Sequence, residues 1–471
     1  MTLSSFKKKY IGSRSFYRMV LAIAVPIMVQ NGITNFVSLL DNIMVGQTGT
    51  EQMSGVSIVN QLLFVYNLCI FGGLSGAGIF TAQYSGQKDD RGIRATFRYK
   101  LGLAVLLTAA VITVLLLAGD RLVSLYLQGE ADGGDLALTL DSAMRYMRVM
   151  LIGLPAFMLV QTYVSTLREC SETLVPMRAG IVAVGTNLLF NWLLIYGNLG
   201  MPKLGVVGAA WATVISRYVE LAIVVVWTHR HTARCTWAQG LYATLAVPGP
   251  LIRRFTVKGF PLLLNEALWS AGQAMLSQCY SVRGLNVVAA MNISSTVNNL
   301  FFIVFGTLGS SIAIVVGQLL GAGRLEEAKD TDTKMIFFSI LCSVGTSAVM
   351  FLICPFIARL YNTSDTVRAT AVALVRVCAC FMPLHAFMNA TYFTLRSGGK
   401  TVITFLFDSV FAWVVSVPIA FALSRLTEIS APGIMVLVSA GDLIKCVAGY
   451  IMVKKNLWIH NIIGAEEKQP Q

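Results

Sequence analysis

The chain has 471 residues, of which 56% are hydrophobic and only 13% are charged. Soluble domains carry nearer a quarter of charged residues, so this composition excludes an ordinary soluble protein and indicates a membrane protein. The formal net charge is +13, but no basic residues cluster on a soluble module, so we expect no binding of nucleic acid.

Apolar runs long enough to cross a bilayer recur along the whole chain. A spanning helix needs about 20 mostly apolar residues, and twelve runs meet this requirement. Their ranges are 17–42, 53–82, 99–119, 144–166, 176–197, 205–227, 256–280, 287–317, 335–361, 368–395, 402–424 and 431–453. The first run follows a basic, polar start without a small-residue cleavage site, so we interpret it as a retained helix and not as a signal peptide.

The distribution of Lys and Arg predicts the orientation. Twelve spans place both termini on one side, where the terminal segments and loops carry 25 Lys and Arg, against 6 in the opposite loops. Under the positive-inside rule, both termini are therefore expected in the cytoplasm, and the protein is expected in the cytoplasmic membrane.

The second half of the sequence repeats features of the first half at two fixed spacings. Four pairs show it: Pro26 with Pro261 and Gly86 with Gly321, 235 residues apart, then Arg168 with Arg396 and Arg217 with Lys445, 228 residues apart. The repeat predicts an all-α membrane protein of two six-helix bundles related by a pseudo-two-fold axis along the membrane normal. We expect an N-terminal bundle over 1–228, a cytoplasmic connecting loop over 229–254, and a C-terminal bundle with a short tail over 255–471. This symmetry suits a transporter in which one bundle rocks against the other.

Three stretches resemble the MATE family, the multidrug and toxic compound extrusion transporters. They are 187–217, similar to the fifth helix, loop and sixth helix of the family, 24–46, similar to its first helix, and 83–94, similar to its second cytoplasmic turn. The resemblance implies a secondary active transporter that exports cationic or amphipathic compounds in exchange for protons or sodium ions. It implies no enzyme activity, and we expect no catalytic residue and no cofactor beyond the coupling ion.

Two other kinds of transporter remain as alternatives. A major facilitator transporter also has six plus six helices, but its usual turn between helices two and three is matched only in part by 86–94. A lipid-linked saccharide flippase often has fourteen spans and a cationic cavity, whereas this chain has twelve runs and acidic residues in the candidate cleft. A channel or a membrane scaffold fits less well, because a channel needs polar rings along its pore and a scaffold needs no buried carboxylates.

Glu266 is the first candidate site residue. If the seventh helix starts near Phe255, Glu266 lies about 16 Å into the membrane, close to its midplane. A carboxylate at that depth costs several kcal/mol unless it faces water, pairs with a cation or takes up a proton, which makes it a candidate for ion coupling. The alternative is a structural hydrogen bond inside the bundle.

Asp41 is the candidate in the first half, and it matches the helix-one aspartate of the family. Its position about 36 Å along a straight first helix is beyond the membrane core, but Pro26 can kink the helix and draw that end inward. Asn187 and Asn191 lie one turn apart on one face of the fifth helix, where one branch of the family has an aspartate in place of Asn191. We expect Asp41 to contribute to ion coupling and to substrate binding, and both asparagines to contribute to substrate binding.

Several other polar or aromatic residues of the spans are weaker candidates. Tyr66, Tyr163 and Trp269 are candidates for binding organic cations through their ring faces, although aromatic residues in spans more often pack or face lipid. Asn389 is a further candidate, because the tenth run lacks the acidic residue that family members often pair with the helix-seven glutamate. Asp408 in the eleventh run is a possible substitute.

Two acidic residues are expected to have structural roles. Glu220 is three residues from Arg217, and Asp442 is three residues from Lys445, so each is expected to pair with the basic residue of its own helix. The partners that we expect are small organic substrates and membrane lipids, and we expect a monomer. The choice between protons and sodium ions, and the identity of the exported compound, stay open.

Overall fold

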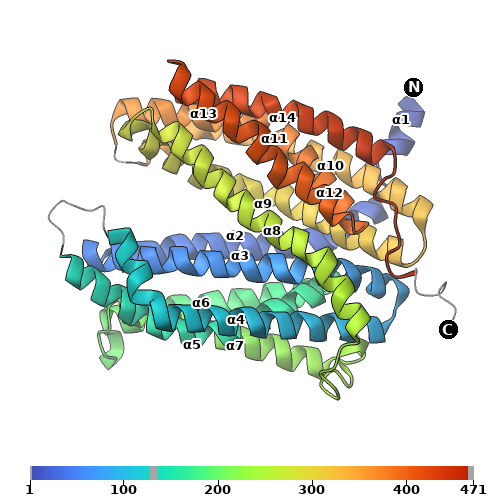
Figure 1. Cartoon of the computed structure of the whole chain (residues 1–471), viewed down its shortest axis with the longest axis horizontal. Helices are drawn as coiled ribbons and strands as arrows, with labels where there is room; N and C mark the ends of the chain where they lie inside the picture. Colours follow the sequence, from blue (N-terminus) through green and yellow to red (C-terminus); the bar gives the residue numbers. More distant parts are fainter. Residues whose placement is uncertain (1–2, 128–134, 362, 465–471) are drawn as a thin grey trace. The chain divides into compact units, whose positions relative to one another are not determined.

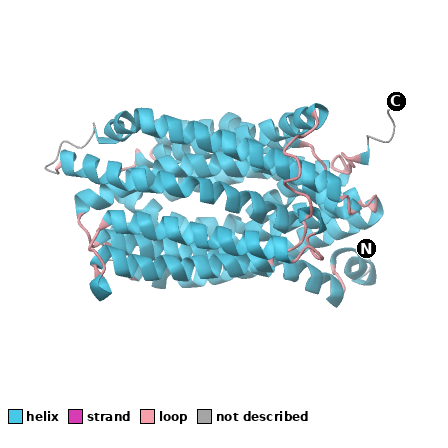
Figure 2. Ribbon diagram, turned by 90° about the horizontal axis from the view of Figure 1, so that it is seen from below, coloured by secondary structure: helices cyan, strands magenta, loops and turns pink. Residues whose placement is uncertain are grey.

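The structure, a computed structural model, describes residues 3–127, 135–361 and 363–464, and every regular element in these ranges is helical (Figures 1 and 2). The helices are α1 Leu3–Tyr10, α2 Arg14–Gly46, α3 Thr50–Gln87, α4 Asp90–Leu127, α5 Leu136–Glu169, α6 Leu174–Tyr196, α7 Val206–Arg230, α8 Gly249–Ser281, α9 Leu285–Gly321, α10 Leu325–Arg359, α11 Asp365–Ser397, α12 Thr401–Phe405, α13 Val417–Leu426 and α14 Ala431–Lys454. Between α12 and α13 the chain forms two π-helical segments, η3 Leu406–Val410 and η4 Ala412–Ser416.

Eleven helical segments within the described ranges are long and apolar enough to cross a membrane. One of them, Thr401–Leu426, joins α12, η3, η4 and α13 into a single segment. The twelfth long helix, α8, lies over the predicted seventh span, and Asn265, Glu266 and Gln273 make it less apolar than the others. The prediction of an all-helical membrane protein is therefore confirmed.

The predicted connecting loop is shorter in the structure than in the prediction. α7 ends at Arg230 and α8 begins at Gly249, so residues 249–254 belong to the helix and only residues 231–248 connect the two helices. This connection contains one 3-10 turn, η2 Thr236–Ala238, and the guanidinium of Arg98 on α4 donates to the carbonyls of Gly240 and Leu241. These bonds satisfy backbone groups that a connecting loop would otherwise leave exposed.

The chain forms two compact units, which share three of the helices. The N-terminal unit comprises Val29–Thr81 and Asp90–Thr256, and the C-terminal unit comprises Met1–Met28, Ala82–Asp89 and Val257–Gln471. The division of α2 falls between Met28 and Val29, just after the helix-interior Pro26. The predicted halves, 1–228 and 255–471, stay a prediction, and residues 465–471 of the second half lie outside the described residues.

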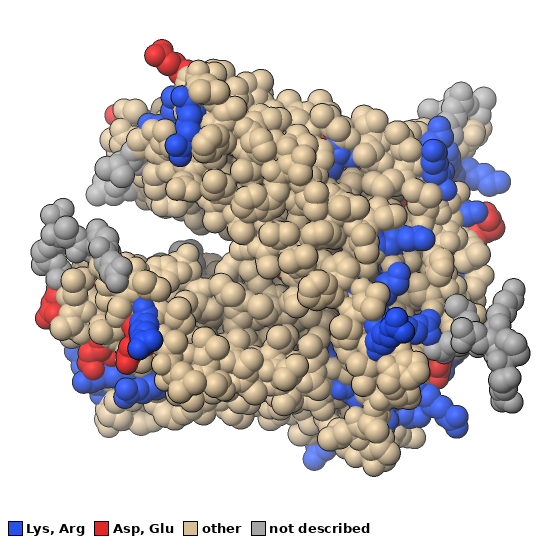
Figure 3. All heavy atoms as spheres, viewed as in Figure 1, with Lys and Arg blue, Asp and Glu red and all other residues tan. Residues whose placement is uncertain are grey.

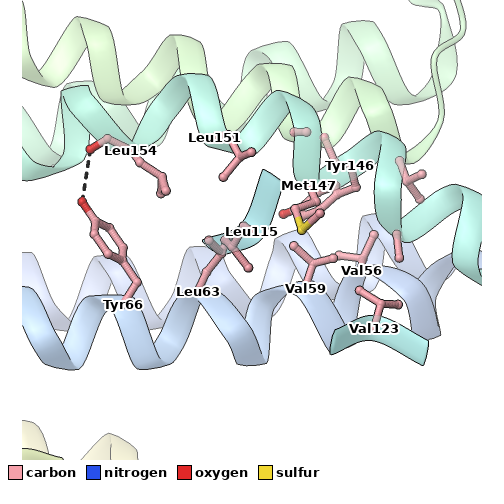
Figure 4. Close-up of a cluster of buried hydrophobic side chains, with 14 of the residues drawn as sticks. Val56, Val59, Leu63, Tyr66, Leu115, Val123, Tyr146, Met147, Leu151 and Leu154 are labelled. Carbon is pink, nitrogen blue, oxygen red and sulfur yellow. Dashed lines mark hydrogen bonds between the residues drawn. The ribbon is translucent and has the colours of Figure 1, made fainter. Parts of the chain in front are cut away.

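The core of the N-terminal unit lies where α3, α4 and α5 meet. Val59 and Leu63 of α3, Leu115 of α4, and Met147 and Leu151 of α5 are buried in one apolar cluster (Figure 4). Since lipid is as apolar as these side chains, the close packing of the helices, rather than removal from water, supplies much of the stabilisation.

A close crossing of α3 and α9 organises the C-terminal unit. A Cβ added at Gly86 would lie 1.9 Å from the backbone oxygen of Gln318, and a Cβ added at Gly321 would lie 2.0 Å from that of Gln83. The two glycines occupy equivalent positions of the repeat, and so do the two glutamines. Only glycine permits backbones to approach so closely, which explains the small residues at these positions.

Gln83 also holds the segment that follows the last helix. Its Nε2 donates to the carbonyl oxygens of Ser397 and His460 at 3.1 and 3.2 Å, and its Oε1 accepts from the backbone nitrogen of Ile462 at 2.9 Å. The side chain is fully buried. Gln83 therefore ties the end of α3, the end of α11 and the C-terminal segment together within one unit.

Charged side chains gather near the helix ends on the face shown in Figure 3, and the middle of the helices is almost free of them. Ion pairs at these ends join residues one turn apart, such as the exposed Arg145 and Asp141, or the half-buried Lys334 and the exposed Asp330. This distribution is the one that a lipid bilayer imposes, because unpaired charges are costly at membrane depth.

Candidate functional site

Asp41, on α2 in the N-terminal unit, is bonded by amides of α6. Asn191 Nδ2 donates to Asp41 Oδ1 at 2.6 Å. In the amide orientation that satisfies its hydrogen bonds, Asn187 donates to Oδ1 at 2.9 Å and to Oδ2 at 3.2 Å. Both asparagines are buried, whereas Asp41 is only half-buried. The structure thus brings three of the predicted site residues together around one accessible carboxylate.

A basic residue of α7 lies near this group. Arg217 Nη1 donates to Glu220 Oε2 at 2.9 Å, which confirms the predicted pair on one helix. Arg217 also interacts electrostatically with Asp41, and its guanidinium lies 5.5 Å from the ring centre of Phe157. Arg217 therefore lies near both Asp41 and Glu220, and Glu220 also interacts electrostatically with Arg168 of α5.

Glu266 is half-buried on α8 in the C-terminal unit. Within the described part of the chain its carboxylate has no hydrogen bond or ion pair, and its charged neighbours are Arg396 of α11 and Asp408 of η3. The structural hydrogen bond considered as the alternative role is therefore not formed in this state. A carboxylate without a bonded partner at this depth is the kind of group that takes up a proton or another cation.

Asn265, the residue before Glu266, belongs to a polar group that extends over two further elements. Asn265 Nδ2 donates to Asp408 Oδ2 at 3.2 Å, and the hydroxyl of Ser409 donates to Asn265 Oδ1 at 2.7 Å. Lys445 Nζ on α14 donates to Asp408 Oδ1 at 2.7 Å. Asn265 is fully buried, so α8, η3 and α14 are joined in the interior of the unit.

The expected pairing of Asp442 with Lys445 is wrong. Lys445 pairs across helices with Asp408, and Asp442 Oδ2 lies 3.6 Å from Nε2 of His385 on α11. The i,i+3 spacing allows a pair on one helix, but a carboxylate on a facing helix competes for the same ammonium. The sequence gives Asp408 only as a substitute for the missing acidic residue of the tenth run, and the repeat does not reveal its pair with Lys445, because Arg217, the equivalent of Lys445, pairs with Glu220 of its own helix.

Tyr66 and Tyr163 are buried among helices of the N-terminal unit. The hydroxyl of Tyr66 contacts Thr108 Oγ1 at 2.8 Å and donates to the carbonyl oxygen of Leu154 at 3.3 Å (Figure 4). The hydroxyl of Tyr163 lies 2.5 Å from that of Tyr242 and 3.0 Å from Nε2 of His229. These contacts favour roles in packing, and substrate binding by either residue stays a prediction.

The remaining two predicted residues lie in the C-terminal unit. Trp269 is one turn after Glu266 on α8, and 39% of its side chain is exposed. Asn389 of α11 is half-buried against Gly309 of α9, where an added Cβ would lie 2.0 Å from Asn389 Oδ1. That oxygen accepts no hydrogen bond from any residue that the structure describes. Neither residue forms a hydrogen bond with Glu266 among the described residues, and their roles in substrate binding stay predictions.

Comparisons with known sequences match both halves of the chain. The family model MatE matches residues 26–193 and 261–422. A probable multidrug resistance protein NorM of Thermotoga maritima is 23% identical over 88% of this chain and 87% of that protein. The multidrug resistance protein PmpM of Pseudomonas aeruginosa is 24% identical over 87% of this chain and 84% of that protein.

Comparisons with solved structures show the same fold. One similar structure is the outward-facing conformation of a multidrug resistance MATE family transporter of the MOP superfamily. It is 20% identical in sequence, and the match covers 93% of this chain and 95% of that transporter, with a TM-score of 0.83. A MOP superfamily transporter from Pyrococcus furiosus, whose binding pocket is described as reversed in polarity, is 19% identical over 97% and 98%, with a TM-score of 0.82. The predicted architecture of twelve helices in two bundles is thereby confirmed.

Proposed function

Because the chain belongs to the MatE family, we propose that it is a secondary active efflux transporter. It exports cationic or amphipathic compounds across the cytoplasmic membrane in exchange for protons or sodium ions. The matches to curated multidrug resistance proteins over most of the chain support the substrate class. The major facilitator alternative has no support from these matches.

The observation that carries the proposal is one accessible carboxylate within the spanning helices of each unit. Asp41 and Glu266 are both half-buried, and neither forms an ion pair within 4 Å among the described residues. An acidic group at membrane depth that is not neutralised internally attracts a cation from solution. An exchanger of organic cations for protons or sodium ions needs such groups, since both of its cargoes are positive.

We assign different roles to the two carboxylates because their environments differ. Asp41 accepts hydrogen bonds from amides, which leaves its charge in place to attract an organic cation. Glu266 accepts no hydrogen bond from the described residues, and its cationic neighbour Arg396 does not form an ion pair with it, so a coupling cation can bind at this carboxylate. Neither role is catalytic, and no covalent chemistry is required.

Transport in proteoliposomes tests this function. We expect a fluorescent organic cation to be transported when a proton or a sodium gradient is imposed in the opposite direction, and not without a gradient. Glu266→Gln should remove the dependence on the coupling ion, because it keeps the size of the side chain and removes its charge. Asp41→Asn should mainly weaken binding of the organic cation. Asp141→Asn, which removes an exposed charge of α5, is the matched control and should transport like the wild type.

Three outcomes would contradict the proposal or its assignment of roles. Transport by the wild type that responds to no ion gradient would exclude ion-coupled exchange. Normal ion dependence in Glu266→Gln would exclude Glu266 as the coupling group, and loss of ion dependence with unchanged substrate binding in Asp41→Asn would reverse the two roles.

The orientation and the assembly state are part of the proposal. The excess of Lys and Arg in the segments predicted to be cytoplasmic supports cytoplasmic termini. We propose that the chain functions as a monomer surrounded by lipid, as each unit has its own apolar core.

A further inference from the structure

The C-terminal unit has two carboxylates at its candidate site, and among the described residues only Asp408 forms a direct ion pair; Arg396 acts on Glu266 without such a pair. Lys445 Nζ lies 2.7 Å from Asp408 Oδ1, whereas Glu266 forms no ion pair with any described residue. Asn265 joins the two positions, because it precedes Glu266 on α8 and donates to Asp408. The two carboxylates thus differ in one respect: a lysine of the protein pairs with Asp408, and no described residue pairs with Glu266.

The backbone around Asp408 is unusual for a membrane span. Residues 406–410 and 412–416 form π-helical turns, and α-helix resumes at Val417. A π-helical segment inserts extra residues into the turns of a helix, changes the direction of the side chains after it, and is frequent at functional sites. Here it accompanies the bond from Ser409 to Asn265 and the pair of Asp408 with Lys445.

Other titratable groups near Asp408 come from the neighbouring elements. α8 contributes Glu266, α11 contributes Tyr392 and Arg396, and α14 contributes Lys445. The hydroxyl of Tyr392 lies 3.4 Å from Asn265 Nδ2. His385 of α11 and Asp442 of α14 form a separate weak pair, with 3.6 Å between Nε2 and Oδ2. Among these groups, Lys445 is the only basic residue that forms an ion pair with Asp408.

The repeat shows that this pair is specific to the second half. Lys445 corresponds to Arg217 at the spacing of 228 residues, and Asp408 then corresponds to Gly180. In the N-terminal unit the basic residue pairs with Glu220 of its own helix, and the position equivalent to Asp408 has no side chain. Both halves therefore have a basic residue at this position, but only the C-terminal half has a carboxylate at the position of Asp408 to pair with it.

We propose that Lys445 is a tethered counter-ion that occupies Asp408 permanently and so limits the C-terminal half to one exchangeable cation, which binds at Glu266. This inference rests on the proposed ion-coupled export and concerns its stoichiometry. A lysine side chain cannot leave the protein, so Asp408 exchanges nothing with solution while Lys445 holds it. Removal of Lys445 leaves a carboxylate inside the membrane without its cation, and that group recruits a proton or a sodium ion from solution.

Three variants distinguish this role from a purely structural one. Lys445→Met removes the charge and keeps an unbranched side chain, Lys445→Arg keeps the charge, and Asp408→Asn combined with Lys445→Met removes both charges. The measured quantity is the number of coupling cations exchanged per organic cation. It is obtained in proteoliposomes, at clamped membrane potential, from the steady-state substrate gradient that a known proton or sodium gradient supports.

We expect Lys445→Met to exchange one more cation per substrate than the wild type. Under an imposed cation gradient of about tenfold, the steady-state substrate gradient should then be about tenfold larger, because each coupled cation contributes its full gradient. Lys445→Arg and the double variant should both retain the stoichiometry of the wild type. The proton and sodium arms of the experiment show which cation Asp408 recruits.

The outcomes separate the inference from the proposed function. A wild type without ion dependence would overturn the proposed function, and the inference with it. Ion-dependent wild-type transport with an unchanged stoichiometry in Lys445→Met would overturn the inference alone. If Lys445→Met does not fold, the double variant decides, because a loss of one coupled cation there would show that Asp408 exchanges a cation in the wild type.

Discussion

The close crossing of α3 and α9 makes a quantitative prediction for two glycines. A methyl group at Gly86 would lie 1.9 Å from the backbone oxygen of Gln318, and one at Gly321 would lie 2.0 Å from that of Gln83. Side-chain carbons essentially never approach other atoms closer than 3.0 Å. The atoms in the way belong to backbone, which cannot rotate aside, so α3 and α9 must separate by about 1 Å to accept alanine.

The expected cost follows from this separation. Overpacking of a well-packed interior costs about 1–3 kcal/mol, and more where backbone has to move. Gly102→Ala is the matched control, because Gly102 lies in α4 with nothing within 4 Å of its added Cβ. Alanine favours a helix over glycine by up to about 1 kcal/mol, so the control should unfold at the same midpoint as the wild type or slightly above it.

Unfolding of the purified protein in detergent, followed by intrinsic tryptophan fluorescence, measures these effects. Gly86→Ala and Gly321→Ala should lower the midpoint to a similar extent, because each methyl group meets the backbone oxygen of an equivalent glutamine. Midpoints for both variants that equal that of Gly102→Ala would refute the close crossing. A large effect from only one glycine would refute the equivalence of the two contacts.

Two further predictions concern the buried charges and the orientation of the chain. Lys100→Met should destabilise the fold by about 3–5 kcal/mol in the same unfolding assay, because Lys100 is fully buried and pairs with Glu169 at 2.5 Å; adding Glu169→Gln should recover most of the loss, and no recovery would show that the pair is not the cause. For orientation, a membrane-impermeant maleimide added to intact cells should label Lys203→Cys and spare Ala233→Cys, since these exposed loop positions are predicted on opposite sides. Cys235 should not interfere, because burial raises the pKa of its thiol to about 12, and labelling of Ala233→Cys from outside would contradict cytoplasmic termini.

Much of the fold follows from the sequence alone, for reasons that are local. Backbone groups in lipid must bond within their own segment, so an apolar run of about 20 residues becomes a helix whatever its neighbours are. The number of spans, the repeat and the family resemblance could therefore be predicted. The i,i+3 pair of Arg217 with Glu220 was predictable for the same reason, since helix geometry places the two side chains together.

The partners of the candidate site residues were decided by the tertiary structure. Asp41 and Asn191 are 150 residues apart in sequence, and only the packing of α2 on α6 brings them to 2.6 Å. Lys445 is three residues from Asp442, yet it bonds to Asp408, 37 residues away. Neither partner could be predicted from helix periodicity. Periodicity shows which residues share a face of one helix, but it does not show which other helix packs against that face.

The physical reason lies in the membrane environment. Lipid contributes little to the choice between alternative helix contacts, because apolar side chains are equally soluble in tails and in the protein interior. Close fits between backbones, as at Gly86 and Gly321, and bonds between charged groups, as between Asp408 and Lys445, therefore decide which helices meet. The sequence alone determined which segments cross the membrane, whereas three-dimensional packing determined that Asp408 pairs with Lys445 and that Glu266 has no ion pair among the described residues.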